Sequence, residues 1–534
     1  MSLADLGNQV GKVESICQAA QYVMDPLIAF QQLCADSEYA VLLESAEIES
    51  KDNLQSIILV DAALRFECNQ DTVVCRALSE NGEHILSLID AECPTTIKKT
   101  LGANNITLQC LPPASDIDED ERLKQPSVFD ALRLVLQHIQ AIRNDPHAVF
   151  LGGAFAYDLL ATFEQLPAVA KSENTCPDYV FYVAETLLRI DHQTRTTNVL
   201  GSVFSGPQVA NAYLRISQRV EAIKAALTEL PSALPKFNPV AESGVLQVDK
   251  TDSEFIADVN ALKEHILAGD IFQVVPSRTF SLPCPDPMLA YAKLRQQNPS
   301  PYMFYLKDND FCMFGASPES ALKYSADTNI VEIYPIAGTR PRGKRADGSL
   351  DADLDSRIEL SLRDDHKEKA EHLMLVDLAR NDVARVSQPG TRFVKDLLKV
   401  DRYSHVMHLV SRVVGQLRDD LDALHAYQAC MNMGTLVGAP KVSAARLIRE
   451  VEQKRRGSYG GAVGYLTGTG DMDSCIVIRS AFVRNEIAYI QAGAGVVYDS
   501  DPQAEADETR SKAQAVISAI VSAFSSEQAQ GEAL

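Results

Sequence analysis

Two pairs of glutamates stand three residues apart in the second half of the chain, Glu368 with Glu371 and Glu505 with Glu508. Residues i and i+3 share one face of a helix, so each pair can direct two carboxylates toward one point. Two such helices could hold a hard divalent cation, for example Mg²⁺, through oxygen ligands. Solvated surface glutamates have the same spacing. The apolar runs beside the first pair favour partial burial, and with it the metal site.

Two histidines, His405 and His408, lie in the otherwise apolar segment 403–414. One interpretation is a pair of hydrogen-bonded core histidines. The other is a proton donor that titrates near neutral pH. The residues alone leave both open.

A glycine-rich stretch, 457–464, surrounds Tyr459, and Gly493 and Gly495 form a second close pair of glycines. Glycine lets backbone amides approach a ligand without a Cβ in the way. Arg479, in a strand predicted over 474–482, could bind a carboxylate through two hydrogen bonds. The alternative interpretations are a flexible turn for the glycine-rich stretch and a surface position for Arg479.

The elements that must position these residues are indicated by periodicity and capping signals. The capping-box pattern Thr251-Asp-Ser-Glu254 and the following apolar period predict a helix that ends at Gly269. Consecutive strands without intervening helices favour antiparallel pairing and an α+β fold. We expect strands at 271–275, 303–306, 311–314, 330–334, 461–466, 474–482 and 487–491, and helices at 364–380, 419–433, 440–453 and 503–524.

The whole chain has 534 residues, 46% of them apolar, and a formal charge of −22 from 50 basic and 72 acidic side chains. This acidity argues against nucleic acid as a partner. We expect no membrane span and no secretory signal, and therefore a cytoplasmic protein with reduced cysteines. The Pro-rich segment 231–244 predicts a boundary between a first domain, 1–240, and a second, 245–520, followed by a tail, 521–534.

Taken together, the motifs of the second half resemble those of the chorismate-utilising enzymes and run in the family's order over residues 250 to 515. A segment near the N-terminus, 42–51, resembles the family's tryptophan-binding motif. The resemblance implies large, mainly antiparallel sheets packed as an orthogonal sandwich and covered by helices, in two intertwined domains. The resembling motifs are 272–278, 314–320, 334–343, 369–382, 406–411, 438–441 and 491–495.

The resemblance also implies roles for single residues. Glu371 and Glu508 are expected to bind Mg²⁺, with Glu368 and Glu505 assisting through waters. The expected chorismate contacts are Gly338, Thr339, Tyr459, Arg479, Gly493, Ala494 and Gly495, and the expected catalytic residues are His408, Glu319 and Thr435. A feedback site for L-tryptophan is expected at Ser45, Pro301, Tyr302 and Met303, with Cys475 in its wall.

Two positions separate members of the family. At Gln273, relatives that add water carry a lysine that acts as a base, so glutamine favours ammonia as the nucleophile. At Ala337, aminodeoxychorismate synthases carry a lysine, so alanine favours amination at ring carbon C2 and aromatisation to anthranilate. An aminodeoxychorismate synthase and a non-catalytic amino-acid-binding regulator are the alternatives.

The expected reaction joins chorismate and ammonia and releases anthranilate and pyruvate. His408 would protonate the departing C4 hydroxyl, and Glu319 would take a proton from the incoming ammonium. No glutaminase motif is visible in the chain. A separate glutamine amidotransferase (glutaminase) subunit that supplies ammonia is therefore expected, in an assembly with two of each subunit.

Overall fold

The computed structural model describes residues 6–7, 9–45, 54–110, 117–231, 245–345, 347–403 and 406–524. Several predictions lie outside these residues. They are the second part of the tryptophan motif, 46–51, nearly all of the boundary segment 231–244, His405, and most of the tail.

Almost all strands belong to one network of mainly antiparallel pairs, which confirms the predicted α+β class. The network has two arms that share the long strands β3 (Gln55–Asn69) and β9 (Tyr179–Asp191). The first arm continues through β10 (Thr196–Phe204), β1 (Lys12–Ala20) and β7 (Gln140–Ala141) on one side, and through β2 (Ala40–Glu44), β14 (Tyr302–Lys307), β15 (Cys312–Ser317), β24 (Ser480–Arg484), β25 (Ile487–Gly493), β13 (Ser277–Pro283) and β11 (Gln247–Val248) on the other.

The second arm holds most of the strands that carry the predicted catalytic residues. It runs through β4 (Thr72–Ala77), β6 (Asn105–Gln109) and β5 (Lys98–Leu101) on one side, and through β8 (Phe150–Phe155), β22 (Ala462–Thr467), β23 (Met472–Ile476), β16 (Ser320–Ser325), β17 (Ile330–Ile333) and β20 (Val406–Gln416) on the other. β20 pairs with β17 and β18 (Ile336–Pro341) along one edge and with β19 (Phe393–Arg402) along the other. A separate pair joins β12 (Gln273–Val274) to β21 (Gly438–Ala439).

The two arms form the two sheets of a sandwich. The register between β3 and β9 shifts repeatedly between Leu59 and Leu64, and such bulges bend a strand from one sheet into another. One apolar cluster combines side chains of both arms, including Phe304 and Phe482 from the first and Val463 from the second. The inner faces of the arms therefore pack against each other.

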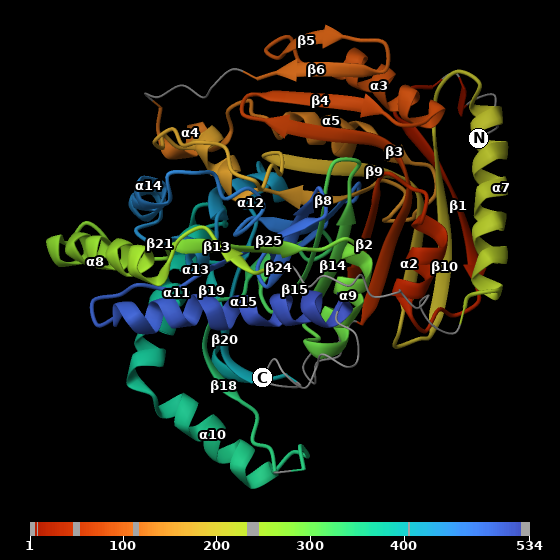
Figure 1. Cartoon of the computed structure of the whole chain (residues 1–534). Helices are drawn as coiled ribbons and strands as arrows, with labels where there is room; N and C mark the ends of the chain where they lie inside the picture. The colour runs from red at the N-terminus through yellow and green to blue at the C-terminus, as the bar shows by residue number, and fades with distance from the viewer. Residues whose placement is uncertain are drawn as a thin grey trace.

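Helices cover the outer face of each sheet, so the fold has four layers (Figure 1). The helices of the first sheet are α2 (Pro26–Cys34), α7 (Val209–Thr228), α9 (Pro287–Gln297) and α15 (Pro502–Phe524). Those of the second are α3 (Glu80–Glu92), α5 (Asp130–His138), α8 (Asp252–Ala268), α11 (His366–Ala384), α12 (Ala423–Cys430) and α14 (Lys441–Glu452). Short helices are α4 (Glu119–Leu123), η1 (Tyr157–Leu159), α6 (Leu160–Phe163) and α13 (Gly434–Val437).

One helix, α10 (Ala352–Asp364), projects from the body of the molecule at the bottom of Figure 1. Its Leu362 packs against Met407 and Leu409 of β20 in a small cluster of its own. This lobe adjoins the strands that lead into the site described below.

Strands of the two halves of the sequence pair directly. β2 pairs with β14, and β8 pairs with β22. The halves are thus joined by backbone hydrogen bonds within both sheets. The exact domain limits, 240 and 245, stay a prediction.

The predicted helices are present, although the one predicted over 419–433 is helical only over Ala423–Cys430. Two predicted strands are shorter or divided. The capping box at Thr251 and the left-handed cap at Gly269 are both present around α8. The predicted strand 271–275 pairs only at Gln273 and Val274. The predicted strand 474–482 is divided into β23 and β24, because Arg479 adopts a positive φ of 50° that no strand can continue.

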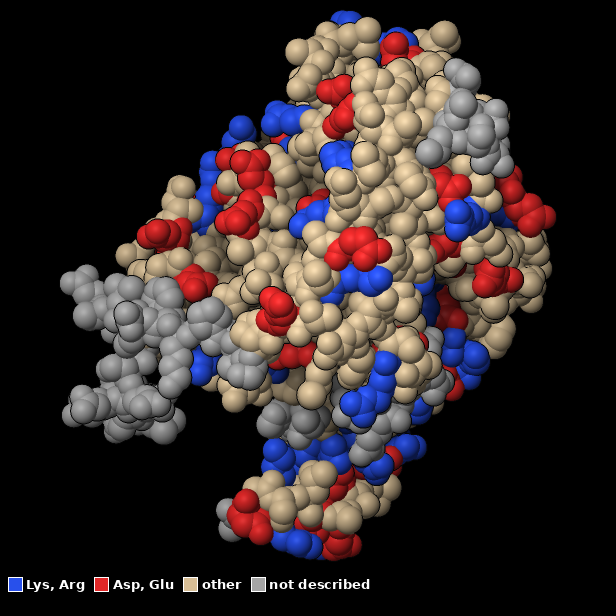
Figure 2. All heavy atoms as spheres, turned by 90° about the vertical axis from the view of Figure 1, so that its right-hand side faces the viewer, with Lys and Arg blue, Asp and Glu red and all other residues tan. Residues whose placement is uncertain are grey.

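The surface carries both signs of charge. On the face shown in Figure 2, acidic and basic side chains are interspersed over most of the surface. No helix in the described parts of the chain is both long and apolar enough to span a bilayer.

Candidate active site

A cavity of about 510 Å³ brings together nearly all of the predicted site residues. They come from segments far apart in the sequence: β16 and its approach, β18, α11, β20, α13, the glycine-rich stretch before β22, the turn before β24, the end of β25, and α15. The predicted residues that line it are Glu319, Gly338, Thr339, Glu368, Glu371, His408, Thr435, Tyr459, Arg479, Gly493, Gly495, Glu505 and Glu508.

A β-bulge sets the position of His408. The register between β18 and β20 shifts between Ala337 and Thr339, and Gly338 has a positive φ of 72°. This extra residue places Thr339 opposite His408, and the Thr339 Oγ1 lies 2.9 Å from the His408 Nδ1. The hydroxyl thus orients the ring, which also interacts with the backbone of Gly338.

Burial shifts the pKa values of the two predicted acid–base residues in opposite directions. Burial, assisted by the charge of Arg479, lowers the pKa of His408 to about 4. Burial raises the pKa of Glu319 to about 8, although a 3.1 Å hydrogen bond from the Thr435 Oγ1 opposes the shift. At neutral pH and without a ligand, the imidazole is therefore neutral and the carboxyl group carries a proton.

Arg479 supplies positive charge to the cavity. Its positive φ places it at the turn between β23 and β24, and not in a strand as predicted. The guanidinium forms no ion pair with any described residue, and its pKa is lowered because burial disfavours the charge. A partly buried arginine without an ion pair among the described residues is suited to an anionic ligand.

Gly493 is required by a close backbone contact, and Gly495 lies close to a side chain. A Cβ at residue 493 would lie 2.7 Å from the Pro276 carbonyl oxygen and 3.0 Å from the Tyr459 hydroxyl. A Cβ at residue 495 would lie 2.9 Å from the Gln273 amide nitrogen. Ala494 is fully buried and does not line the cavity, and its amide donates to the Pro276 carbonyl at 3.1 Å. Its expected contact with chorismate stays a prediction.

The four glutamates lie on two helices as predicted, Glu368 and Glu371 on α11 and Glu505 and Glu508 on α15. Glu368 forms an ion pair with Arg340 at 2.8 Å, and Glu508 forms one with Lys512 at 2.6 Å. A Cβ at Gly338 would lie 3.0 Å from the Glu368 Oε2, so this backbone adjoins the carboxylates.

The donor set is suited to Mg²⁺. The carboxylates of Glu371 and Glu508 line one cavity, and Mg²⁺ is commonly held by one or two carboxylates together with substrate oxygens and waters. Within the described ranges, no three His, Cys, Asp or Glu side chains form a ready-made cluster. A site with two protein ligands is compatible with this arrangement.

Lys512 is the functional candidate that the motifs missed. Its Nζ contacts the Gly493 carbonyl oxygen at 3.0 Å and lines the cavity beside Glu508. The sequence could have indicated Lys512, because it lies four residues after Glu508 and therefore on the same face of the helix. Gln273 and Ala337, which separate family members, also line this cavity.

The residues predicted for the feedback site divide between two faces of β14. Ser45 and Met303 line a second cavity of about 370 Å³, together with Glu44, His192 and Arg295. Tyr302 points to the opposite face, as alternation along a strand requires, and its hydroxyl lies 3.3 Å from Asp473. Pro301 directly precedes β14. Cys475 lies in the core between the sheets and outside the lining of this cavity, contrary to expectation.

The comparisons with known proteins agree with this geometry. A family model described as "chorismate binding enzyme" matches residues 91–518, and the chain belongs to this family. Among its relatives are two proteins named anthranilate synthase component 1. The one from Vibrio parahaemolyticus is 59% identical over 97% of this chain and 94% of its own length, and the one from Escherichia coli K12 is 56% identical over 95% and 96%.

Solved structures show the same fold. Anthranilate synthase component I from Streptococcus pneumoniae superimposes with a TM-score of 0.65 at 27% identity, over 93% of this chain and 98% of that one. The menaquinone-specific isochorismate synthase of Escherichia coli superimposes with a TM-score of 0.67 at 16% identity, over 97% of both chains. This similarity concerns the fold alone. The chain is therefore a chorismate-utilising enzyme of the kind named anthranilate synthase component 1.

Proposed function

We propose that the chain is the large subunit of a synthase that converts chorismate and ammonia into anthranilate and pyruvate. It would act as a carbon–oxygen lyase in tryptophan biosynthesis. One observation supports the proposal most: a single cavity is lined by an arginine without an ion pair among the described residues, by a glutamate whose pKa is raised to about 8, and by four carboxylates on two helices.

Binding of the doubly anionic chorismate requires local positive charge in an acidic protein. Arg479 supplies a guanidinium, and the backbone around Gly338 and Gly493 allows close approach. Glu371 and Glu508 are the residues that would hold Mg²⁺, with Glu368 and Glu505 near them. When bound, the ion would act as a Lewis acid that neutralises the ring carboxylate.

The proton-transfer roles follow from the two shifted pKa values and differ from those that the sequence predicts. In the first step, the ammonia nitrogen bonds to C2, and the C4 hydroxyl leaves as water with the proton of Glu319. The new C2 ammonium then returns a proton to Glu319, so the step is balanced. Thr435 holds the Glu319 carboxyl group in place through its hydrogen bond.

In the second step, the C2 proton is removed and the C3–O bond breaks, which makes the ring aromatic. The enolate that leaves takes up a proton and becomes pyruvate. His408 is available as the base, because its imidazole is neutral at pH 7 and Thr339 orients the ring. Burial thus favours His408 as a proton acceptor and not as the donor to the hydroxyl.

Two side chains of the cavity favour ammonia and aromatisation. Gln273, whose amide lies 3.5 Å from the Glu371 Oε1, cannot activate water as a lysine would. Ala337 offers no amine that could compete with ammonia. The two residues together support anthranilate as the product.

Ammonia is proposed to come from a glutaminase partner, in a complex with two copies of each subunit. The name "component 1" of the relatives supports a second component. L-Tryptophan is proposed to bind in the cavity of Ser45 and Met303 and to inhibit the enzyme. This cavity is separate from the active-site cavity, so the inhibition would be allosteric.

The test is anthranilate fluorescence after the purified chain is mixed with chorismate, Mg²⁺ and an ammonium salt. The chain contains no tryptophan, so the intrinsic background is low. Mass analysis of the product separates anthranilate from aminodeoxychorismate. Absence of any chorismate turnover would favour the non-catalytic regulator, and glutamine use by the chain alone would refute the partner.

A further inference from the structure

A buried ion pair lies behind the wall of the active-site cavity. Arg456 directly precedes the glycine-rich stretch 457–464, and Glu452 is the last residue of α14. Their side chains are only 1% and 4% exposed. The Arg456 Nε donates to the Glu452 Oε2 at 2.8 Å, and the Nη2 donates to the Oε1 at 2.5 Å. Neither residue lines the cavity, and neither was predicted from the sequence as part of the site.

Arg456 holds two segments of the cavity wall through their backbone. Its Nη1 donates to the Leu436 carbonyl at 2.8 Å, and its Nη2 donates to the Val275 carbonyl at 2.6 Å. Leu436 belongs to α13 and Val275 follows β12, and both residues line the cavity. One planar guanidinium group therefore joins two wall segments that are far apart in the sequence.

The same guanidinium contacts two tyrosine rings. Its central carbon lies 4.5 Å from the ring centroid of Tyr157 and 5.5 Å from that of Tyr459. A cation within about 6 Å of a ring centroid is attracted by the ring. Tyr459 lines the cavity, and its hydroxyl lies beside Gly493, where an added Cβ would be only 3.0 Å from it. Arg456 thus restricts the position of the Tyr459 ring.

Glu452 holds a further part of the wall through a chain of hydrogen bonds. Its Oε1 accepts from the Ser277 amide at 2.8 Å and from the Ser277 hydroxyl at 2.7 Å. The Ser277 hydroxyl in turn accepts from the Gln491 Nε2 at 2.8 Å. Gln491 belongs to β25 and lines the cavity two residues before Gly493. The ion pair is therefore connected to a second side chain of the wall.

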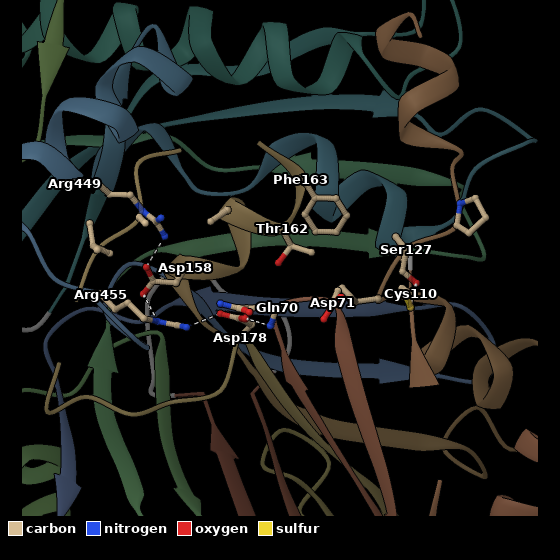
Figure 3. Close-up of a pocket in the computed structure, with 15 residues that line it drawn as sticks. Gln70, Asp71, Cys110, Ser127, Asp158, Thr162, Phe163, Asp178, Arg449 and Arg455 are labelled. Carbon is tan, nitrogen blue, oxygen red and sulfur yellow. Dashed lines mark hydrogen bonds and ion pairs between the residues drawn. The ribbon is translucent and has the colours of Figure 1, made fainter. Parts of the chain in front are cut away.

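The neighbouring Arg455 faces a different cavity and provides a contrast. This cavity, of about 340 Å³, is lined among others by Asp71, Asp178 and Arg449 and by none of the predicted site residues (Figure 3). Arg455 forms an ion pair with Asp178 there, and its side chain is 21% exposed. Two consecutive arginines thus form ion pairs of the same kind, but Arg456 holds the wall of the active-site cavity and Arg455 does not line that cavity.

We propose that Arg456 and Glu452 are positioning residues, which set the Tyr459 hydroxyl and the Gln491 amide at the places where these groups contact chorismate. Neither member of the pair touches the substrate. A buried network of hydrogen bonds and charges has few alternative arrangements, so it holds the wall in its binding geometry before the substrate arrives. A wall that is already ordered lowers the cost of binding. The inference rests on the proposed function, because it takes chorismate as the ligand of the cavity.

The first test is a double-mutant cycle of Arg456→Lys and Tyr459→Phe. Lysine keeps the charge beside Glu452, but it lacks the planar fork that reaches two carbonyls and stacks on the ring. We expect Arg456→Lys to raise KM for chorismate at least about tenfold and to lower kcat less than about threefold, because the acid–base residues are held by other hydrogen bonds. In the Tyr459→Phe background no hydroxyl is left to position, so the same change should raise KM less than about threefold.

The second test is Ser277→Ala, which leaves the ion pair in place. The change removes the hydroxyl between Glu452 and Gln491 and keeps the backbone hydrogen bond to Glu452. We expect KM to rise about three- to tenfold, with no further rise in a Gln491→Ala background. Circular dichroism and the thermal midpoint show whether each variant is folded, and the Ser277 cycle decides the matter if Arg456→Lys does not fold.

The matched control is Arg455→Lys, which weakens an ion pair at the adjacent position of the same segment. Its KM should stay within about twofold of the wild-type value. Equal increases in Arg455→Lys and Arg456→Lys would indicate general loosening of the segment and would overturn the positioning role. An unchanged KM in the folded test variants, or additive effects in the cycles, would also overturn it while the active wild type upholds the proposed function. A wild-type chain that does not turn over chorismate refutes the proposed function, and the inference falls with it.

Discussion

Replacement of Glu319 by glutamine should make the protein more stable and less active. Burial raises the pKa of Glu319 from the ordinary value of 4.5 to about 8. The native state therefore keeps a proton that the unfolded chain releases above pH 4.5. Native stability consequently falls as the pH rises from 4.5 to about 8, by about 1.4 kcal/mol for each pH unit. The wild-type chain is destabilised by about 3 kcal/mol at pH 7 and by at most about 5 kcal/mol above pH 8.

Glutamine has no proton to lose and can still accept the hydrogen bond from Thr435. The difference in unfolding free energy between Glu319→Gln and the wild type should therefore be near zero at pH 4.5 and should grow with pH. The kcat should fall by about 10²–10⁴, because the acid that protonates the leaving hydroxyl is gone. The assays are urea unfolding at pH 5, 7 and 8.5 and the rate of anthranilate formation.

The matched control is Glu332→Gln. Glu332 is paired with Arg412, and this side-chain hydrogen bond together with the one from Tyr334 holds its pKa below the ordinary value, in spite of burial. Loss of the Glu332 carboxylate should lower the free energy of unfolding at neutral pH, whereas loss of the Glu319 carboxyl group should raise it. If Glu319→Gln and the wild type lose stability in parallel as the pH rises, or if the variant keeps full activity, the assignment of Glu319 as a protonated acid is wrong.

Four further predictions concern other residues of the cavities. His408→Ala should lower kcat by about 10²–10⁴ with nearly unchanged chorismate affinity, and mass analysis should detect the aminated, non-aromatic intermediate; an unchanged kcat would remove His408 from catalysis. Glu371→Gln should raise the Mg²⁺ concentration needed for half-maximal rate at least about tenfold, and a wild-type metal response would contradict its role as a ligand. Arg479→Lys should raise KM for chorismate by about 10–100-fold, since the planar fork is lost, whereas an unaltered KM would separate Arg479 from the substrate. Ser45→Phe should relieve inhibition by L-tryptophan at least about tenfold without a change in kcat, and saturating chorismate should weaken tryptophan binding in the wild type; persistent inhibition in the variant would move the feedback site elsewhere.

The glutamates of the site could be predicted from the sequence, because their spacing matches the period of a helix. Glu368 with Glu371 and Glu505 with Glu508 meet the helix period, and apolar periodicity places both pairs on helices that the structure contains. Their convergence was not predictable from spacing, because it depends on how α11 and α15 pack against two different sheets.

The errors have local physical causes. Arg479 lies in an apolar run that is typical of a strand, and only its positive φ of 50° ends the strand there. Ala494 stands between two site glycines, but it is fully buried and does not line the cavity. The cavity at Asp71 and Arg449 could not be foreseen, because these residues are far apart in the sequence and belong to no common motif.

The pairing of β2 with β14 and of β8 with β22 has a consequence for how such a chain can change in evolution. An N-terminal half that shares both sheets with the C-terminal half cannot be exchanged as an independent unit. A chimaera that takes residues 1–240 from a distant relative would also have to inherit matching strand edges, so the two halves of this architecture are constrained to diverge together.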